Sequence, residues 1–329
     1  MAARLIGRLL IAVIIYLTVG TAVFFASFVL YRSDIAVNVP WLISIERKLY
    51  FSGGWHVWQA QADCVDFDPR LIYKPKLGTC RFANIEYDTT PTFTRYGRKM
   101  AAVAPGGSGI AVIGDSFAMG WGVEDAETYS AELQRRTGRK VYNLAVSSYG
   151  TVRELMRLES SGLLDAVDTV IIDYCDNDLD ENLNFTVPTP AEARNKFREI
   201  TAPRLGDRRA YLRYLLEAYK FAIKLPFSEA KRLILGRGER EDFVPHYEPL
   251  MKAIRGMPAL SDKRVFVIYT NSYGAKFKNF PTGRDKTMKN VVFVDLNLVR
   301  QDFYLLDSHL NRLGHERIGR ELAEVVKMK

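Results

Sequence analysis

Four short segments of this chain contain the residue types that activated-serine chemistry requires, and each lies where a predicted strand ends and a loop or helix begins. In chain order they are Gly114-Asp115-Ser116-Phe117, Ser148-Tyr149-Gly150-Thr151, Cys175-Asp176-Asn177-Asp178 and Asp307-Ser308-His309-Leu310. A serine hydroxyl is a poor nucleophile until a base takes its proton and hydrogen-bond donors stabilise the oxyanion that follows. Ser116 follows an apolar run and a glycine, and we expect it to be the nucleophile.

The general base must come from the histidines, which are His56, His246, His309 and His315. His309 is favoured because Asp307, two residues earlier, can hold the tautomer of an imidazole through Nδ1. His56 and His246 lie outside the four segments, and His315 falls inside the predicted last helix. We therefore expect His309 to be the base and Asp307 its partner.

The oxyanion needs hydrogen-bond donors close to the serine. The backbone N–H groups of Ser116 and Gly150 are candidates, since a glycine lets a substrate approach the backbone closely. The side-chain amide of Asn177 is a third candidate, because it follows the end of a predicted strand. Loss of one such donor typically lowers the rate on the order of 100- to 1000-fold.

Apolar runs separated by helical patterns predict a parallel sheet with helices on both faces. The predicted strands cover residues 110–113, 141–146, 168–174, 264–270 and 291–296, and the predicted last helix covers 311–326. The carboxyl ends of parallel strands form one edge, where ligands bind, so we expect the four segments to meet there. Thr151 and Glu154 indicate a capping box at the start of a helix.

Taken together, these segments resemble the SGNH hydrolase family, also called GDSL esterases, over roughly residues 108–329. The resemblance implies an α/β fold of the flavodoxin-like kind, a three-layer α/β/α sandwich with a central parallel sheet. It also implies that Ser116 is both nucleophile and oxyanion donor, with Gly150 and Asn177 as the other donors. His309 would be the base and Asp307 its partner. Neither a metal nor an organic cofactor is implied.

Two positions depart from the pattern of that family. The third segment usually begins with Gly, and here Cys175 stands in its place. The last segment often places two residues between Asp and His, and here only Ser308 separates them. The shorter spacing resembles the branch that contains membrane-attached and periplasmic glycan O-acetyl esterases and transferases. Asp295, at the end of the fifth predicted strand, is the alternative partner for the histidine.

The amino terminus contains a run from Leu9 to Tyr31 of 23 residues without a charge. At about 1.5 Å per residue this run can cross a hydrocarbon core of roughly 30 Å. Arg4 and Arg8 precede it, so the positive-inside bias keeps the first residues in the cytoplasm and places the rest in the periplasm. A cleaved signal peptide is the alternative, because residues 20–22 are small. The apolar run continues for nine residues beyond them, which favours an uncleaved single-pass anchor in the cell membrane.

Changes in composition divide the chain into three parts. Residues 1–32 are a cytoplasmic stub and transmembrane anchor, 33–106 a small extracytoplasmic extension, and 107–329 a hydrolase-like domain with a helical insertion at about 180–262. Residues 192–240 of the insertion hold 13 Lys/Arg against 6 Asp/Glu. This segment is either an ordinary solvated helix face or a lid or interfacial helix that touches anionic lipid or polysaccharide. The second interpretation depends on Arg208, Arg209 and Arg213.

The three cysteines fall into two groups. Cys64 and Cys80 lie 16 residues apart in the extension, and outside the cytoplasm this invites a disulfide. The alternative is two unpaired buried thiols. Cys175 ends an apolar strand and has no histidine beside it in the sequence, so we expect a small core residue rather than a nucleophile.

The composition narrows the function further. Hydrophobic content of 48% and charged content of 26% indicate a folded protein. The net charge of +8 comes with no zinc-finger or RNA-recognition pattern, so no nucleic-acid partner is expected. We expect a membrane-anchored serine esterase that hydrolyses an O-acyl ester, most simply acetyl, on a cell-envelope glycan or lipid. The alternatives are an O-acyltransferase supplied by an acyl-donor membrane partner, and a non-catalytic glycan-binding or assembly protein.

Overall fold

The computed structural model describes residues 2–30, 40–51, 56–103, 106–202, 212, 215–217, 219–224, 242–274 and 276–327. The chain forms two compact units. The first unit comprises Met1–Trp55, Pro203–Glu239 and Leu305–Asp307, and the second comprises His56–Ala202, Arg240–Tyr304 and Ser308–Lys329. Ser116, Gly150, Asn177 and His309 belong to the second unit, whereas Asp307 belongs to the first.

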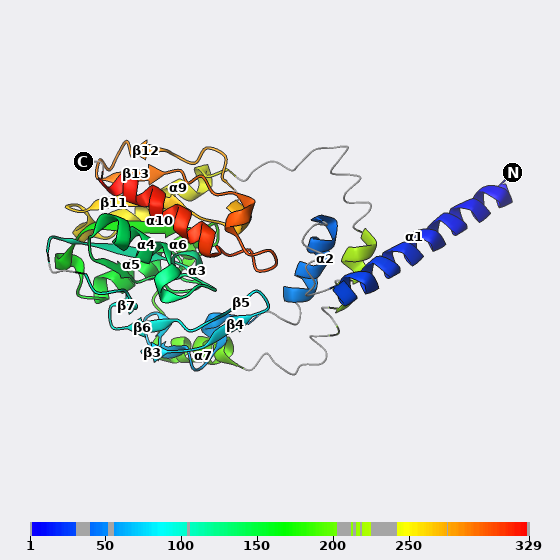
Figure 1. The fold of residues 1–329 in the computed structure, drawn as a ribbon, viewed down its shortest axis with the longest axis horizontal. Coiled ribbons are helices and arrows are strands. Elements are labelled where there is room, and N and C mark those ends of the chain that lie inside the picture. Colours follow the sequence, from blue (N-terminus) through cyan, green and yellow to red (C-terminus); the bar gives the residue numbers. More distant parts are fainter. Residues whose placement is uncertain are drawn as a thin grey trace. The chain divides into compact units, whose positions relative to one another are not determined.

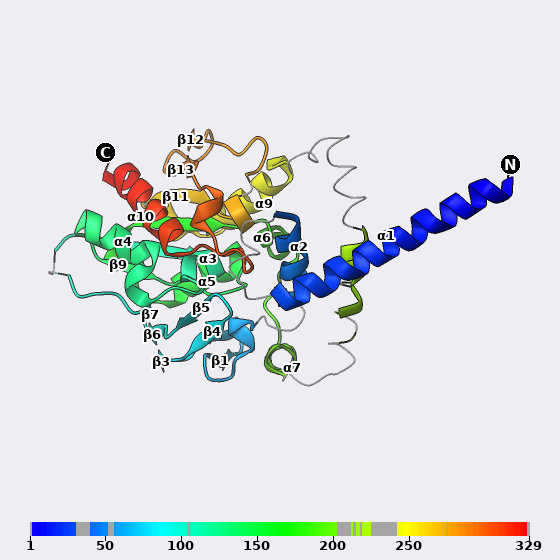
Figure 2. The same cartoon turned by 45° about the vertical axis from the view of Figure 1, so that its right-hand side comes forward.

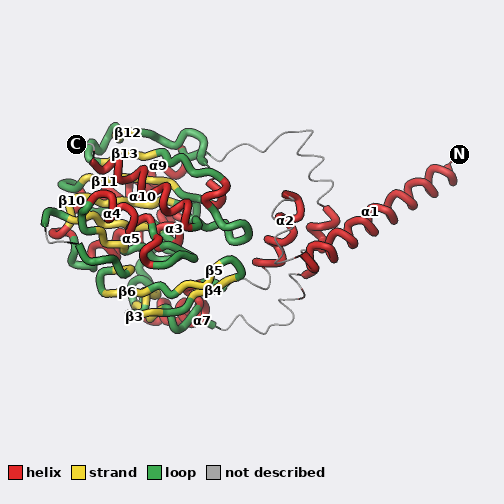
Figure 3. Tube along the Cα trace, in the orientation of Figure 1, coloured by secondary structure: helices red, strands yellow, loops and turns green. Residues whose placement is uncertain are grey.

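The second unit is built on a nine-stranded mixed sheet, whose strand order is β12-β13-β11-β10-β8-β9-β7-β6-β3. Figure 3 draws strands in yellow, among them β10, β11 and β13 of this sheet. Five adjacent strands are parallel: β13 (Val291–Val294), β11 (Arg264–Tyr269), β10 (Val167–Tyr174), β8 (Gly109–Gly114) and β9 (Val141–Asn143). Antiparallel strands complete the sheet on both sides, namely β12 (Gly283–Arg284), β7 (Gly97–Arg98), β6 (Thr92–Thr94) and β3 (Gly78–Thr79). All five predicted strands are present, although those predicted at 141–146 and 291–296 end earlier.

Helices cover both faces of this sheet (Figures 1 and 2). On one face α4 (Tyr129–Thr137) packs against α10 (Arg312–Lys327). On the other face α5 (Thr151–Ser160), α6 (Asp178–Asn184) and α9 (Val244–Arg255) pack against one another. The predicted three-layer α/β/α architecture is therefore confirmed, and the parallel centre of the sheet carries antiparallel strands at both edges.

The core explains why the parallel strands are so apolar. All six residues of β8 are buried, because helices lie over both of its faces. Ala111 and Ile113 share a core cluster with Leu155 of α5 and Leu250 of α9. Successive strand residues point to opposite faces, so Ile110 and its alternating neighbours face the layer of α4 and α10.

Residues 56–103 belong to the same compact unit as the hydrolase-like domain. Their strand β7 pairs with β9, and thereby adds β7, β6 and β3 to the central sheet. Two hairpins lie outside that sheet: β1 (Val65–Asp68) with β2 (Ile72–Pro75), and β4 (Phe82–Asn84) with β5 (Tyr87–Thr89). Cys64 and Cys80 form a disulfide with a Cα–Cα distance of 5.4 Å. The domain boundary at residue 106 stays a prediction. Strands on both sides of that residue belong to the same sheet.

The predicted insertion contains α6, α7 (Pro190–Thr201) and α9. Thr189 caps α7 in a capping box with Glu192, which explains where this helix begins. Arg208, Arg209 and Arg213, on which the lid interpretation depends, lie outside the described residues.

The first unit contains α1 (Ala2–Leu30), α2 (Pro40–Leu49) and a helical stretch within 212–224. Ile6–Ser27 of α1 is long and apolar enough to cross a membrane, with a mean hydropathy of 2.5. A small core of Ile45, Leu49 and Ala222 joins α2 to the helical stretch. The predicted apolar helix is therefore present, and its role as an anchor is taken up below.

Candidate active site

Ser116 stands at a sharp turn between strand β8 and the short helix α3 (Ser116–Met119). Gly114 makes this turn with a φ of +156°, and a Cβ at that position would lie 2.5 Å from the Cβ of Ala118. Asp115 caps the helix, since its Oδ1 accepts a hydrogen bond from the N–H of Phe117 at 2.9 Å. The glycine and the cap together fix the direction of the serine hydroxyl.

The serine and His309 are joined by a hydrogen bond of 2.8 Å between Ser116 Oγ and His309 Nε2. The histidine backbone is held by Tyr304, whose N–H donates to the His309 carbonyl at 2.8 Å. The preceding residue, Ser308, adopts a left-handed φ of +71° and donates from its hydroxyl to Ser272. Residues 193 positions apart in the sequence are thus brought into the geometry of a nucleophile and its base.

Two aromatic side chains hold the imidazole ring. The Trp121 ring stacks on His309 with a centroid distance of 4.4 Å and an interplanar angle of 13°. The Phe117 ring lies 4.9 Å from the same imidazole. Because Phe117 and Trp121 lie one and five residues after Ser116, the segment that carries the serine also holds the His309 ring. Sequence reasoning missed Trp121, since an indole five residues after a serine carries no signal of its own.

A buried carboxyl group lies beside the nucleophile. Asp115 Oδ2 is 3.5 Å from Ser116 Oγ, and the Asp115 side chain is 2% exposed. Burial raises the pKa of Asp115 to about 6, although the Phe117 N–H and the nearby His309 lower it. The side-chain amide of Asn177 also hydrogen-bonds to this carboxyl. Asn177 therefore lies close to the nucleophile turn.

Gly150 and Asn177 are placed at the starts of neighbouring helices. Gly150 is the residue before α5, and Asn177 is the residue before α6. The Thr151 hydroxyl donates to Asp178 Oδ2 at 2.9 Å, and this bond ties the two helix starts together. A Cβ at Gly150 would lie 2.7 Å from the Cβ of Glu181, so only glycine fits there without displacing α6.

The predicted capping box at Thr151 is wrong. Helix α5 begins at Thr151 and its cap residue is Gly150. The Arg153 N–H donates to the Glu181 carboxylate of α6 at 3.1 Å rather than to the Thr151 hydroxyl. The Thr151 hydroxyl donates to Asp178 instead, and Glu154 is buried inside the unit with only 1% exposure. The local sequence pattern could not show that α6 offers a better acceptor from a distant part of the chain.

The acidic partner of the histidine remains a prediction. Asp307 belongs to the first unit, where its carboxylate is buried and accepts a hydrogen bond from the Tyr50 hydroxyl. Asp295, the alternative, is exposed at the end of β13 and forms an ion pair with Lys276 at 2.7 Å.

The other histidines and the lone cysteine have different surroundings. His315 is buried in α10, where its Nδ1 accepts the N–H of Tyr129, and burial lowers the pKa of His315 to about 3. His246 is buried against the Tyr174 hydroxyl at 2.8 Å. Burial raises the pKa of the Cys175 thiol, in keeping with a core residue rather than a nucleophile.

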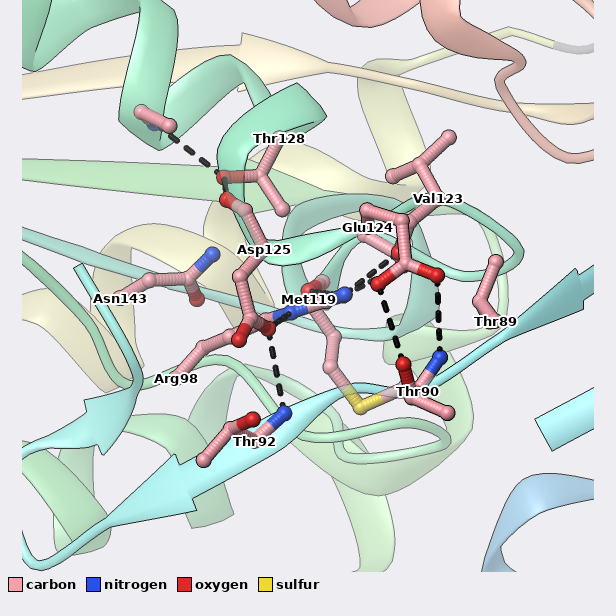
Figure 4. A network of polar contacts seen from close by, with 12 residues as sticks. Thr89, Thr90, Thr92, Arg98, Met119, Val123, Glu124, Asp125, Thr128 and Asn143 are labelled. Carbon is pink, nitrogen blue, oxygen red and sulfur yellow. Dashed lines mark hydrogen bonds and ion pairs between the residues drawn. The ribbon is translucent and has the colours of Figure 1, made fainter. Parts of the chain in front are cut away.

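A buried arginine on strand β7, which is separated from β8 by β9, supports the segment that follows Ser116 (Figure 4). The Arg98 guanidinium donates to the carbonyls of Met119 at 2.8 Å, Gly120 at 2.6 Å and Val123 at 2.5 Å. Its Nε donates to Asp125 at 2.8 Å. These bonds fix the chain on both sides of Trp121, the residue that stacks on the histidine.

Nothing in the sequence around Gly97-Arg98 distinguished this arginine from a surface residue. Arg98 lies in the segment assigned to the extension, where the sequence showed no chemistry. Its side chain is 1% exposed, a burial that only the tertiary structure reveals. Within the described part of the chain, no group of three or more His, Cys, Asp or Glu side chains could hold a metal ion.

No family model and no curated protein matches this sequence. Among solved structures, the chain is similar to a member of the lipolytic protein G-D-S-L family from Veillonella parvula DSM 2008, with 12% identity, 68% of this chain and 100% of that chain covered, and a TM-score of 0.38. It is also similar to a carbohydrate esterase family 2 enzyme from Corynascus thermopiles (Myceliophthora fergusii), with 17% identity, coverage of 70% and 68%, and a TM-score of 0.35. A two-domain esterase active on acetylated mannans shows 13% identity, coverage of 67% and 48%, and a TM-score of 0.35. Identities and TM-scores this low carry no argument about chemistry, which rests on the geometry of the site.

Proposed function

We propose that this protein is a serine esterase that works through an acyl-enzyme. The observation that carries the proposal is the 2.8 Å hydrogen bond between Ser116 Oγ and His309 Nε2. This distance lies within the range in which a base can take a proton directly from a nucleophile. The turn at Gly114 and the stacked Trp121 hold the two groups in this relation.

In the first step, His309 Nε2 takes the hydroxyl proton as Ser116 Oγ forms a bond to the ester carbonyl carbon. The negative charge on the carbonyl oxygen is stabilised by the N–H groups of Ser116 and Gly150 and by the amide of Asn177. The C–O bond to the alcohol then breaks, and the proton on His309 passes to the leaving oxygen. Asp307 is proposed to orient the imidazole during this transfer.

In the second step, water attacks the acyl-serine while His309 takes the water proton. The bond from the acyl carbon to Ser116 Oγ breaks, the serine recovers its proton, and the carboxylic acid leaves. A sugar hydroxyl in place of water would instead give acyl transfer from the same intermediate. That reaction needs an acyl donor, for which a membrane partner is proposed.

The substrate is proposed to be an O-acyl ester, most simply acetyl, on a cell-envelope glycan or lipid. Supporting this location is α1, whose apolar stretch Ile6–Ser27 suits a single-pass anchor. With Arg4 and Arg8 on the cytoplasmic side, the second unit would lie in the periplasm. The disulfide between Cys64 and Cys80 suits such an oxidising compartment.

A fluorophosphonate probe tests the activated serine. The full chain in detergent is incubated with the probe, and the labelled residue is found by mass spectrometry. We expect labelling at Ser116 that is lost in His309→Ala and kept in Ser161→Ala, a serine on the opposite edge of the sheet. Absence of labelling in folded protein would overturn the esterase proposal and favour a non-catalytic glycan-binding protein. Product analysis with and without an oligosaccharide acceptor then separates hydrolysis from transfer.

A further inference from the structure

A second feature of the same sheet edge is a cavity of about 200 Å³ at the carboxyl ends of β11 and β13. Its lining includes Tyr269, Lys276, Phe277, Asn279, Phe280 and Asp295. The proposed reaction does not use this cavity, although its lining includes Asp295, the alternative partner of the histidine in the sequence analysis. Pockets for drug-sized ligands typically measure about 300–1,000 Å³, so this space suits a group of about one ring.

Hydrogen bonds connect the wall of the cavity to the proposed oxyanion segment. The side-chain amide of Asn271 donates to Asp176 Oδ2 at 2.7 Å and to the Tyr269 hydroxyl, also at 2.7 Å. Asp176 is the residue directly before Asn177, whereas Tyr269 lines the cavity. One amide therefore bridges the proposed oxyanion donor and the cavity wall.

A second connection leads to the proposed base. The Ser308 hydroxyl donates to Ser272 Oγ at 3.2 Å, and Ser308 is adjacent to His309. Strand β11 is separated from β8 only by β10. With neighbouring strands about 4.8 Å apart, the end of β8 is about 10 Å from that of β11 and about 14 Å from that of β13, a distance that an oligosaccharide of a few residues can span.

The lining combines two kinds of group. The rings of Tyr269 and Phe280 present apolar aromatic surface, and Phe280 is held by its contact with Phe243 at 4.9 Å. Lys276 and Asp295 present an ion pair whose side chains are 36% and 49% exposed, and which is therefore open to solvent. A sugar ring has the complementary character, because its C–H face is apolar and its hydroxyl edge both donates and accepts hydrogen bonds.

We propose that this cavity binds a sugar ring next to the acylated one, so that the substrate is an acylated oligosaccharide or polysaccharide. A lipid tail is the poorer occupant, since it offers no partner for Lys276 or Asp295 and would leave their charges partly desolvated. This inference rests on the proposed esterase function for its kinetic test. The binding test below does not depend on catalysis.

The kinetic test compares partially O-acetylated oligosaccharides of one and of four sugar residues. For the wild-type protein we expect kcat/KM to be at least 10-fold higher for the longer substrate. Lys276→Met and Phe280→Ala should each reduce this ratio to near one. Lys263→Met is the matched control, because Lys263 lines a second cavity at the amino ends of the strands, and it should leave the ratio unchanged. A wild-type ratio near one, or a preference for an acylated lipid, would overturn the inference.

The binding test uses the Ser116→Ala protein and the tetrasaccharide, with heat of binding as the readout. We expect binding that weakens at least 10-fold when Lys276→Met is added, with thermal melts to confirm that each variant is folded. If ester hydrolysis is absent and this binding is present, the esterase proposal fails while the sugar site stands. If hydrolysis is present and the tetrasaccharide binds no better than a single sugar, only the sugar site fails.

Discussion

The amino ends and the carboxyl ends of the parallel strands differ in the sites that they offer to a ligand. At the amino ends lies a cavity of about 580 Å³, whose lining includes Gly162, Leu164, Asp165, Pro258, Asp262 and Lys263. At the carboxyl ends lie Ser116, His309 and the smaller cavity of about 200 Å³. None of the described residues that line this larger cavity is a nucleophile paired with a base. The volume of a cavity therefore does not indicate where the candidate site lies, whereas the direction of the parallel strands does.

Each edge also has an arginine that binds backbone carbonyls next to β8. Arg98 binds the carbonyls that follow the nucleophile helix, and its side chain is 1% exposed. Arg139 binds the carbonyls of Ser108 and Gly109 at the start of β8, and its side chain is 25% exposed. The two arginines bind the chain near opposite ends of one strand, but only Arg98 binds the segment that contains Trp121.

The largest difference is expected between two serines. Ser116→Ala removes the nucleophile, and we expect kcat for ester hydrolysis to fall by at least about 10⁴-fold. Ser161→Ala, at the amino ends of the strands, should leave kcat unchanged, since the Ser161 hydroxyl donates to the Leu158 carbonyl and accepts from the Leu163 N–H, both beside its own helix end. Equal loss in both variants, measured with a small acetyl ester, would contradict the assignment of the edges.

Two asparagines give the next comparison. Asn177→Ala removes a proposed oxyanion donor and the hydrogen bond to Asp115. We expect kcat to fall on the order of 100- to 1000-fold and the free energy of unfolding to fall by about 1 kcal/mol. Asn290, at the amino edge, donates to the carbonyls of Leu260 and Lys263. Asn290→Ala should lower the free energy of unfolding by about 1 kcal/mol and leave kcat unchanged. Loss of melting temperature without loss of kcat in Asn177→Ala would remove it from the oxyanion site.

Conservative variants of the two arginines test whether Arg98 positions the Trp121 segment for catalysis or only stabilises the fold. Arg98→Lys keeps the charge but cannot reproduce the fork of bonds, so the Trp121 segment should shift and kcat should fall on the order of 10- to 100-fold with KM nearly constant. Arg139→Lys should change kcat by less than about 2-fold, because its exposed bonds lie far from the reacting groups. If the two variants lose kcat equally, Arg98 has no special role in positioning.

The smallest effect concerns two carboxyl groups with opposite pH dependence. The pKa of Asp115 is raised to about 6 by burial. Between its unfolded pKa near 3.8 and pH 6 the folded state binds more protons, so its contribution to stability falls as pH rises, by up to about 1.4 kcal/mol per pH unit. The unfolding free energy of Asp115→Asn relative to the wild type should therefore rise across that window.

For Asp168, at the amino ends of the strands, the contribution to stability changes with pH in the opposite direction. Burial alone would raise the pKa of Asp168, but hydrogen bonds from Thr169 and Arg139 lower it overall. Its contribution is present above pH 3.8 and is lost as pH falls through the lowered pKa. Asp168→Asn should accordingly lose stability relative to the wild type as pH rises through that range. Denaturant titrations at pH steps from 3 to 7 measure both slopes, and slopes of equal sign would contradict these pKa directions.

Much of the candidate site could be predicted from the sequence, because its signals are local. A serine after an apolar run and a glycine, and an asparagine at a strand end, each indicate a place at the carboxyl edge of a sheet. The structure joins Ser116 to His309 and Asn177 to Asp115, whereas the roles of these residues stay predictions. The predicted capping box at Thr151 was wrong because the Thr151 hydroxyl bonds to Asp178, which is 27 residues away and outside any local pattern.

The sequence by itself determined the apolar helix, the strand and helix pattern, and the order of the four segments, because each depends on the chemistry of residues close in the chain. Only the tertiary structure decided which arginine is buried beneath the nucleophile segment, which indole stacks on the histidine, and where a cavity lies. Those features arise when β7 pairs with β9 and when residues nearly 200 positions apart come into contact. Such contacts depend on how the elements pack, and no local pattern of residues records that packing.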